Sequence, residues 1–465
     1  MRPTRYTMRR GVALILVLWL LTVLSAVALE LALFSRLRLQ ATRNTGDGVR
    51  SLSLARSGVE RAVAELKAGK DTAQALEDLR EDAKRIYHNV ELGEGAYTLL
   101  AEPADSSGAE PEYGISDEAA KVNLNTADAA MLSRVPGINA DLAADIIALR
   151  SENKAILDVS DLLAIKRIDP FVLYGEDQNQ NGLLDANEDD GDESWPADNG
   201  DGVLERGLAA YLTCCSAARN VASDGKQRVN IAQASAEQIA SGVQGISQQQ
   251  AQSIVEHRGK QALQSVADLL DVLLVEKATG QKPAEKKEGD GKGDESGTRE
   301  PARPTGAESG EQKPTEKPAK EAGKSETTTT DKKAFDAAGF KAIADYVTVS
   351  EEKVLQGVIN VNTASAKVLA CLPGVDEALA SAICDHRLRH KFESTAELLD
   401  VQGMSVDKFK GICNLVSVRS DVFSVRSFGV LQPAGEPSGG TYCCVVAVID
   451  RTDDKIRLSS WRELP

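Results

Sequence analysis

The chain has 465 residues, 70 of them Asp or Glu and 54 Lys or Arg, which gives a formal net charge of −16. A domain typically has about 100–200 residues, so the chain is long enough for two or more folded units. Because affinity for a phosphate backbone comes mainly from Lys and Arg, this acidic balance argues against nucleic acid as a partner.

The N-terminus predicts a membrane anchor. Four arginines precede Gly11, and residues 12–29 are apolar without one charge, a character that continues to Phe34 past Glu30. A stretch of this length can span a bilayer as a helix, and the positive-inside rule keeps its basic flank in the cytoplasm. We therefore expect a single-pass anchor over residues 12–34, with the bulk of the chain on the outer side. A cleaved secretory signal with its site in residues 25–28 is the alternative.

Beyond the apolar stretch, the pattern predicts that the helix continues. Apolar residues keep near-helical spacing on one side: Leu52, Leu54, Val59, Ala62, Val63 and Leu66. We expect one long helix over residues 12–90, with its first part in the membrane and its second part outside.

A short basic leader that ends in Gly before an apolar helix resembles the type IV pilins and the pseudopilins of type II secretion systems. The resemblance implies a leader of residues 1–11, cleavage by the prepilin peptidase between Gly11 and Val12, and methylation of Val12. The fifth mature residue of the family is usually Glu, whereas here it is Leu16. That carboxylate is thought to pair with the terminal amine of a neighbouring subunit, and a subunit with no neighbour above it would only lose desolvation energy by burying a charge. Leu16 therefore makes the chain similar to the K-type minor pseudopilins, which are placed at the filament tip.

The same resemblance implies an inner-membrane protein with most of its mass in the periplasm. Its partners would be the I-type and J-type minor pseudopilins, with which it would start and cap the pseudopilus. Short strands at 91–121 and alternating strands at 418–465 predict one sheet built from both ends of the chain. We expect an α+β, type IV pilin-like fold in which a helical domain, residues 122–417, is inserted.

Three copies of one pattern lie in this insertion, at residues 122–150, 229–258 and 359–387. Each has a Val/Ile-Asn pair, a helix start and a tight turn between two short helices, which is a helix-hairpin-helix pattern. Hairpins that grip DNA bring backbone N–H groups around a Gly-hydrophobic-Gly turn to a phosphate. The second Gly is missing from all three turns here: Gly137-Ile138-Asn139, Gly245-Ile246-Ser247 and Gly374-Val375-Asp376.

The charges of the copies also argue against DNA. Asp376 would place a carboxylate beside the phosphate, which is unfavourable. Arg150, Arg258 and Arg387 end the copies, and we expect each to cap the last carbonyls of its own helix. We interpret the copies as packing units. A membrane-anchored DNA receptor of the competence type, which also joins one apolar helix to such repeats, is the alternative.

Residues 177–188 match the calcium loop of an EF-hand position by position. The oxygen ligands fall at positions 1, 3, 5, 7, 9 and 12, with Gly182 at position 6: Asp177, Asn179, Asn181, the carbonyl of Leu183, Asp185 and Glu188. We predict structural Ca²⁺ in this loop. We also expect Leu184, directly after Leu183, to anchor the loop to a core.

Residues 175–205 hold eleven acidic side chains and no basic one. Such a density of charge repels itself unless cations neutralise it. A second cation would be held by some of five residues, which extends the calcium segment over 177–201: Asp190, Asp192, Asp198, Asn199 and Asp201. A solvated acidic loop is the alternative.

Residues 277–333 contain almost nothing apolar, and we expect a disordered linker between the second and third copies. The seven cysteines, an odd number without C-x-x-C spacing, leave the disulfide state open. The histidines lack an H-E-x-x-H pattern, and no Gly-rich phosphate loop or G-x-S-x-G elbow occurs. We therefore expect no enzymatic activity.

Overall fold

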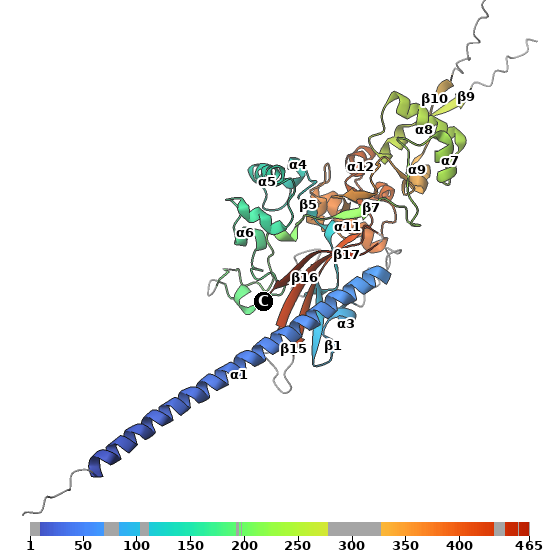
Figure 1. Cartoon of the computed structure of the whole chain (residues 1–465). Helices are drawn as coiled ribbons and strands as arrows, with labels where there is room; N and C mark the ends of the chain where they lie inside the picture. The colour runs from blue at the N-terminus through green and yellow to red at the C-terminus, as the bar shows by residue number, and fades with distance from the viewer. Residues whose placement is uncertain are drawn as a thin grey trace, which may run out of the picture.

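The computed structural model describes residues 10–68, 83–102, 111–191, 195–196, 198–277, 327–431, 442–453 and 455–464. The protein has three parts, which Figure 1 shows: a long N-terminal helix, an antiparallel sheet along the second half of this helix, and a helical domain beyond the sheet. It is thus a mixed helix and sheet protein.

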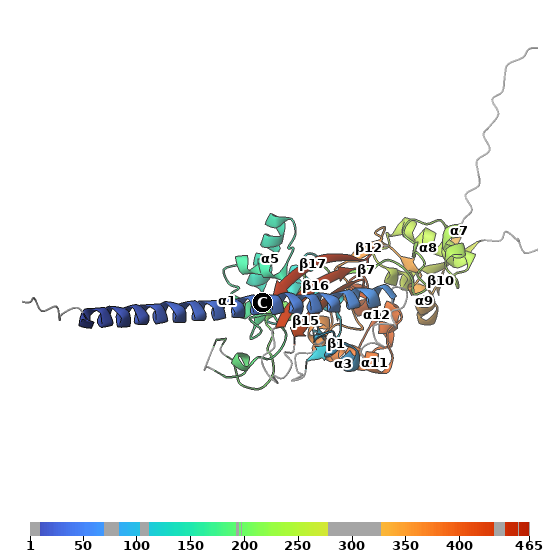
Figure 2. The ribbon, with the colours of Figure 1, turned by 60° about the horizontal axis from the view of Figure 1, so that its bottom comes forward.

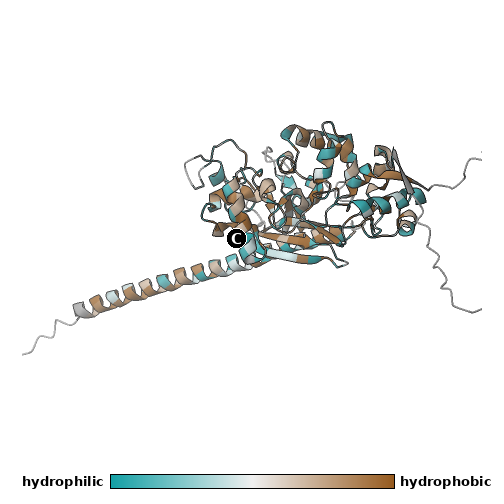
Figure 3. Cartoon of the chain, turned by 90° about the horizontal axis from the view of Figure 1, so that it is seen from above, coloured by the Kyte–Doolittle hydropathy of each residue, from teal (hydrophilic) through white to brown (hydrophobic). Residues whose placement is uncertain are grey.

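Helix α1 (Arg10–Ala68) is 59 residues long. Its first half exposes large apolar side chains, for example Leu16 at 59% and Trp19 at 66%, and Figure 3 shows this apolar length standing free of the rest of the chain. Of the described helices, α1 alone is long and apolar enough to cross a membrane, and its most apolar window is not buried at all. Such a surface is unfavourable in water, so α1 could be a membrane anchor.

The expected helix over 12–90 is too long. Among the described residues, α1 ends at Ala68 and a separate short helix, α3 (Ala83–Tyr87), precedes the sheet. Asn89 has a φ of 51°, a left-handed conformation that Asn tolerates and that does not continue a helix. Strand β1 (Val90–Leu92) therefore begins where the pattern predicts helix.

The second half of α1 packs on the sheet through a stripe of small and apolar side chains. The stripe is buried and recurs at helical spacing: Ala55, Val59, Ala62 and Leu66. A glycine in the sheet lets the helix approach closely, because a Cβ on Gly429 would overlap the carbonyl oxygen of Ser51. Helix and sheet therefore share one core.

The sheet has the order β1–β2–β15–β16–β17, and these pairs are antiparallel. Its longer strands are β2 (Gly95–Ala101), β15 (Val422–Leu431), β16 (Tyr442–Asp450) and β17 (Arg457–Leu464). Two short strands, β3 (Glu112–Tyr113) and β4 (Ser116–Asp117), pair with β2 and β15. Leu100 in β2 is the Cα partner of Arg426 in β15, so residues 118–421 leave the sheet after β4 and return to it at β15.

Three repeats make up the inserted domain, and each begins and ends with two residues that pair as parallel strands. The pairs are β5 (Val122–Asn123) with β6 (Leu212–Thr213), β8 (Val229–Asn230) with β11 (Val347–Thr348), and β13 (Ile359–Asn360) with β14 (Val416–Ser417). We call these units repeat 1 (122–213), repeat 2 (229–348) and repeat 3 (359–417). Between the repeats, β7 (Ala217–Arg219) pairs with β12 (Val354–Gln356).

Each repeat contains two helical pairs, where the sequence predicts one. Repeat 1 has α4 (Ala129–Leu132), α5 (Ala140–Asn153), the 3₁₀ helix η2 (Val159–Ala164) and α6 (Pro170–Tyr174). Repeat 2 has α7 (Ala236–Gly242), α8 (Gln248–Lys260), η5 (Val266–Asp271) and α9 (Ala337–Ala344). Repeat 3 has α10 (Ala366–Leu369), α11 (Glu377–Arg389), η6 (Thr395–Asp400) and α12 (Val406–Ile412). The acidic segment of repeat 1 follows α6 and contains the 3₁₀ turn η3 (Ala186–Glu188), and η4 (Leu208–Ala210) then leads into β6.

The charged linker lies between the second and third copies, as the sequence predicts, and within repeat 2 as the structure bounds it. Its ends pair as antiparallel strands, β9 (Leu273–Lys277) and β10 (Thr327–Lys333), between η5 and α9. The expected disorder over 277–333 is therefore wrong at both ends, where the described residues pair as strands. Residues 278–326 lie outside the described part of the chain.

Repeats 2 and 3 pack against each other through equivalent elements. Helix α9 contacts η6, and helix α12 contacts η5. Phe340 and Phe409, each four residues after the N-cap of its helix, have ring centroids 6.0 Å apart. Two equivalent ion pairs also join the two repeats: Lys341 with Asp400, and Lys410 with Asp271. The pair is therefore nearly twofold symmetric, and Figures 1 and 2 place repeat 3 between the other two.

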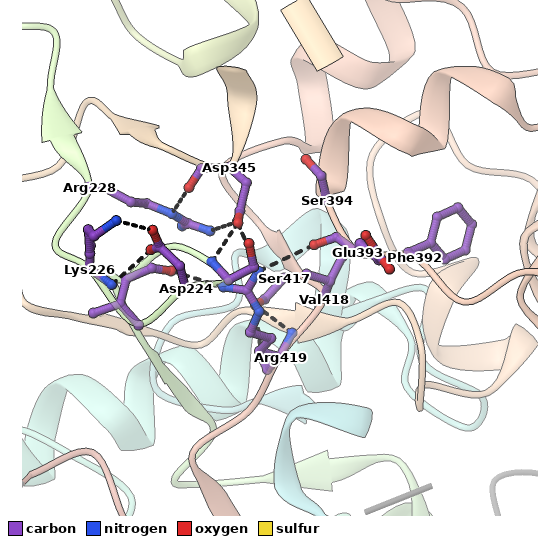
Figure 4. A network of polar contacts seen from close by, with 12 residues as sticks. Asp224, Lys226, Arg228, Asp345, Phe392, Glu393, Ser394, Ser417, Val418 and Arg419 are labelled. Atoms are coloured by element: carbon purple, nitrogen blue, oxygen red, sulfur yellow. Dashed lines mark hydrogen bonds and ion pairs between the residues drawn. The ribbon is translucent and has the colours of Figure 1, made fainter. Parts of the chain in front are cut away.

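A buried carboxylate also joins repeats 2 and 3. Asp345 follows α9 and accepts from Arg228 Nη2 at 2.8 Å and from Arg419 Nη2 at 3.0 Å (Figure 4). Arg419 Nη2 donates further to the carbonyl oxygen of Glu393 at 3.3 Å. Because Arg228 precedes repeat 2 and Arg419 follows repeat 3, this network holds the chain ends of both repeats together.

Candidate functional site

The three predicted hairpins are built alike. Their glycines have positive φ: 85° at Gly137, 93° at Gly245 and 73° at Gly374. The residue that stands in place of the second Gly is the N-cap of the following helix in each case: Asn139 for α5, Ser247 for α8 and Asp376 for α11. Each side chain accepts a backbone N–H in the first turn, so part of the donor set that a phosphate would need is already bound.

The arginines that end the copies hydrogen-bond to backbone carbonyls near the start of the same repeat. Arg150 Nη1 donates to the carbonyls of Leu124 and Ala127, both at 2.9 Å. Arg258 and Arg387 repeat the contact on the carbonyls of Ile231 and Val361, at 2.8 and 2.9 Å. The prediction that they cap the last carbonyls of their own helices is wrong, because the hairpin folds the start of each repeat against the end of its second helix.

Basic side chains beside the hairpins of repeats 1 and 3 have partners within the protein. Lys408 Nζ lies 3.7 Å from a carboxylate oxygen of Asp376. Arg134 Nη1 donates at 2.6 Å to the carbonyl of Leu372, next to the hairpin of repeat 3. The N-cap hydrogen bond from Leu379 lowers the pKa of Asp376, so this hairpin carries a negative charge at neutral pH.

The predicted calcium loop is organised around the carboxylate of Asp177. The N–H of Gly182 lies 3.2 and 3.1 Å from the two carboxylate oxygens. Gly182 has a φ of 73°, the sharp turn that an EF-hand loop needs at its sixth position. Asp177 and Asn181 are buried, at 6% and 5% exposed. The first half of the loop is thus a tight turn in which the backbone N–H of Gly182 faces the carboxylate of Asp177.

The other predicted ligands gather at Asp185. The side-chain amides of Asn179 and Asn181 both donate to Asp185 Oδ2 at 2.7 Å. Glu188, only 1% exposed, accepts the N–H of Asp185 at 3.1 Å. The structure therefore brings these side chains together, with their oxygens accepting loop N–H and NH₂ groups.

The donor chemistry of this loop fits a hard cation. Burial, together with the nearby carboxylates of Asp177 and Asp185, raises the pKa of Glu188 to about 7. Burial also raises the pKa of Asp177. Carboxyl groups that oppose one another's ionisation are stabilised by an added cation. Within the described residues, no group of three or more His, Cys, Asp and Glu side chains could hold a metal by itself, so the two Asn side chains and the Leu183 carbonyl would have to contribute.

The loop rests on the outer face of the sheet. Leu183 packs against a cluster that contains Leu100, Phe428 and Cys444, and the carbonyl of Gly182 accepts Arg206 Nη2 at 3.2 Å. Leu183, and not Leu184 as expected, packs on the sheet. Gly182 lies directly against the Arg426 guanidinium of β15, which brings Leu183 to the sheet.

Buried charges under the loop were not predicted. Glu102, at the end of β2, forms an ion pair with Lys121 and lies 3.7 Å from Arg426 Nη2. Burial opposes ionisation of Glu102, but the positive charges of Lys121, Arg426 and Arg206 outweigh it and hold its pKa at about 2. No local pattern could have revealed this cluster, since its members come from distant segments that only the fold brings together.

The residues proposed for a second cation are held in part by backbone N–H groups of the same segment. The carboxylate of Asp198 accepts N–H groups from Asp190, Gly191 and Gly200 at 3.0, 2.9 and 2.7 Å. The side chains of Asn199 and Asp201 each accept an N–H two residues on, at 2.9 Å. Asp192 lies outside the described residues. These groups adjoin one another without a fixed ligand geometry.

The residues that the leader hypothesis singles out lie near the start of α1. Gly11 and Val12 belong to the first turn of this helix, and Leu16 is among its exposed apolar side chains.

The inserted domain matches a known sequence family. The chain matches the helix-hairpin-helix motif over residues 117–174, 224–286 and 354–416, which correspond to most of repeats 1 and 3 and to the first part of repeat 2. No curated protein matches the chain. The helix-hairpin-helix character of the repeats is thus confirmed, and with the apolar helix it is compatible with a membrane-anchored, DNA-binding protein.

Proposed function

We propose that this protein is a minor pseudopilin of the K type, which starts and caps the pseudopilus of a type II secretion system. The observation that carries the proposal is the arrangement of α1 and the sheet. An apolar helix packs by its second half on antiparallel strands from both ends of the chain, and a domain of three repeats is inserted between β4 and β15. This arrangement supports the pilin-like fold that the N-terminal residues imply.

Position at the tip follows from two features. A domain as large as residues 118–421 could not stack laterally within a thin filament. Leu16 also replaces the carboxylate that would otherwise pair with the amine of a neighbour above. In this proposal, α1 anchors the chain in the inner membrane with its bulk in the periplasm, and the I-type and J-type minor pseudopilins are its partners.

Mass spectrometry of the mature N-terminus tests the pseudopilin proposal. We expect the prepilin peptidase to leave a chain that begins with N-methylated Val12. An N-terminus at Met1, or cleavage within residues 25–28, would contradict it.

We also propose that the loop of residues 177–188 binds one structural Ca²⁺. Six groups would hold it: the side chains of Asp177, Asn179, Asn181, Asp185 and Glu188 and the carbonyl of Leu183. The ion would supply the positive charge that these buried carboxyls lack. The chain itself supplies the frame, because Gly182 orients Asp177 and Leu183 fixes the loop to the sheet. Asp190, Asp192, Asp198, Asn199 and Asp201 are the candidates for a second ion.

Calorimetry on the full chain in detergent tests this loop. We expect saturable calcium binding, weakened about tenfold or more by Asp177→Asn, which removes a charged ligand but keeps its size. Asp224→Asn, in an exposed turn of another segment, is the matched control. Absence of heat from the wild-type chain would refute the assignment.

The second candidate function is that of a membrane-anchored DNA receptor. The three helix-hairpin-helix matches favour it, whereas the capped hairpins and the net charge of −16 oppose it. A gel shift with duplex DNA at low salt separates the two functions. We expect no retarded band; a band that disappears as salt rises would establish DNA binding.

A further inference from the structure

Repeat 1 exposes a group of four large apolar side chains. It consists of Leu163 on η2, Phe171 and Val172 on α6, and Trp195 from the acidic segment, which are 38%, 41%, 36% and 69% exposed. The rings of Phe171 and Trp195 have centroids 6.2 Å apart, and η2 contacts α6. We call these four residues the apolar patch.

The first member of the patch is covered in its sister repeats. Leu163 is the fifth residue of η2, and Leu270 and Leu399 hold the same place in η5 and η6. Leu270 is only 5% exposed and Leu399 packs against the core, since repeats 2 and 3 cover each other's η elements. Among the described residues, no equivalent element covers Leu163, which is 38% exposed.

The next two members are not needed by the repeat itself. Phe171 and Val172 are the second and third residues after the N-cap Asp169. The same places hold Ala338 and Gly339 in repeat 2, and Asp407 and Lys408 in repeat 3. Since the fold accepts small or charged residues there, core packing does not explain a large apolar pair in repeat 1.

The surroundings of the patch are negatively charged. Trp195 belongs to residues 175–205, which carry eleven acidic side chains and no basic one. The hairpin before α6 adds two basic residues, Lys166 and Arg167, but Arg167 lies 3.6 Å from carboxylate oxygens of both Asp141 and Asp145. Even with one or two calcium ions bound, most of this charge would remain.

We propose that the apolar patch binds a cationic amphipathic segment of a partner protein, with aliphatic residues on Phe171 and Val172 and Lys or Arg among the loop carboxylates. An exposed apolar surface with a charged rim is typical of protein interaction sites. Trp195 adds a cation–π partner for a basic side chain. The acidic rim disfavours a second copy of this chain and an anionic membrane surface, because like charges repel.

The probe is a fluorescent helical peptide of about 18 residues, with Leu on one face and Lys on the other. Full-length protein in phosphatidylcholine nanodiscs is titrated, and fluorescence anisotropy is measured. We expect saturable binding that Phe171→Ser with Trp195→Ser weakens about tenfold or more, because buried aromatic anchors dominate such interfaces. Leu388→Ser is the matched control, since Leu388 is 83% exposed in repeat 3. A peptide with Glu in place of Lys should not bind.

Three results would overturn the proposal. Equal binding to the wild-type chain and the double variant would mean that the acidic segment attracts the peptide without the patch. Absence of any peptide binding would contradict a cationic amphipathic partner. A wild-type dimer in sedimentation velocity that the double variant dissociates would identify a second copy as the occupant. Matching thermal unfolding of both serine variants shows that folding is not the cause, and none of these outcomes depends on the N-terminus of the mature chain.

Discussion

At the residue scale, the buried charges beneath the acidic loop join three parts of the molecule. Glu102 directly follows β2, Lys121 precedes repeat 1 and Arg426 lies in β15. Lys121 and Arg426 have only 11% and 12% of their side chains exposed. A buried charge without its counter-charge is strongly destabilising, whereas the complete group contributes little net stability. The cluster therefore makes the junction between sheet and insertion sensitive to a single substitution.

Glu102→Gln should destabilise the protein at neutral pH. It leaves Lys121 with the more distant Glu118 and removes the ion pair of Arg426. We expect a loss of about 3–5 kcal/mol in the free energy of unfolding. The pKa of Glu102 is about 2 in the fold against an ordinary value of 4.5. Its ionic contribution is thus complete above pH 4.5 and is lost as the pH falls towards 2.

Urea unfolding at pH 7 and at pH 3, with chelator present, checks this prediction. The wild-type and variant chains should differ less at pH 3 than at pH 7. The matched control is Glu463→Gln, which removes an exposed ion pair to Arg56 and should cost no more than about 1 kcal/mol. Equal effects of both substitutions would contradict the role of the buried cluster.

Local patterns predicted the residues that depend on spacing. Gly137, Gly245 and Gly374 occupy positive φ in the predicted turns, and Gly182 does so at its place in the loop. The hydrogen bonds of Arg150, Arg258 and Arg387 to the start of each repeat were not predicted. Their acceptors are carbonyls about 25 residues earlier in the chain, and backbone acceptors leave no sequence pattern. The same holds for Glu102 and Arg426, which meet only after the sheet has formed.

At the element scale, repeats 2 and 3 are stabilised by each other rather than separately. Phe340 and Phe409 lie at the centre of their contact and are 0% and 1% exposed. The sequence predicts the first helical pair of each repeat from the spacing of apolar residues. It did not reveal that α9 pairs with η5 in repeat 2, because the charged linker separates these two helices by more than sixty residues.

Phe409→Ala should therefore destabilise both repeats. Loss of a fully buried ring leaves a cavity between α9 and α12 and costs about 3–5 kcal/mol. Lys410→Ala removes the neighbouring ion pair to Asp271, in which both side chains are partly exposed, and should cost no more than about 1 kcal/mol. Hydrogen exchange measures where protection is lost. We expect faster exchange in α9 as well as in α12; a change confined to α12 would mean that the repeats are independent.

At the scale of the whole molecule, the chain has two parts: the exposed first half of α1, and the folded body that begins where α1 meets the sheet. The composition of the first 34 residues and the alternation of the C-terminal strands were sufficient to predict an apolar helix and a sheet. The pairing of β2 with β15 is a contact across more than 300 residues, and its register follows from packing against α1 rather than from either strand alone. That is why strand existence was easier to predict than the sheet order.

Deletion of residues 1–35 should separate membrane attachment from folding. Residues 13–35 expose their apolar side chains and pack on nothing among the described residues, whereas the helical stripe of Ala55, Val59, Ala62 and Leu66 keeps its whole contact with the sheet. We expect the truncated chain to appear in the soluble fraction, and its urea midpoint to match that of the full chain in detergent. If α1 were instead a core helix of a soluble protein, the deletion would lower the midpoint and leave the distribution between membrane and soluble fractions unchanged. A truncated chain that still sediments with membranes would place the anchor elsewhere, because the remaining helix has no uncharged stretch long enough to cross a bilayer.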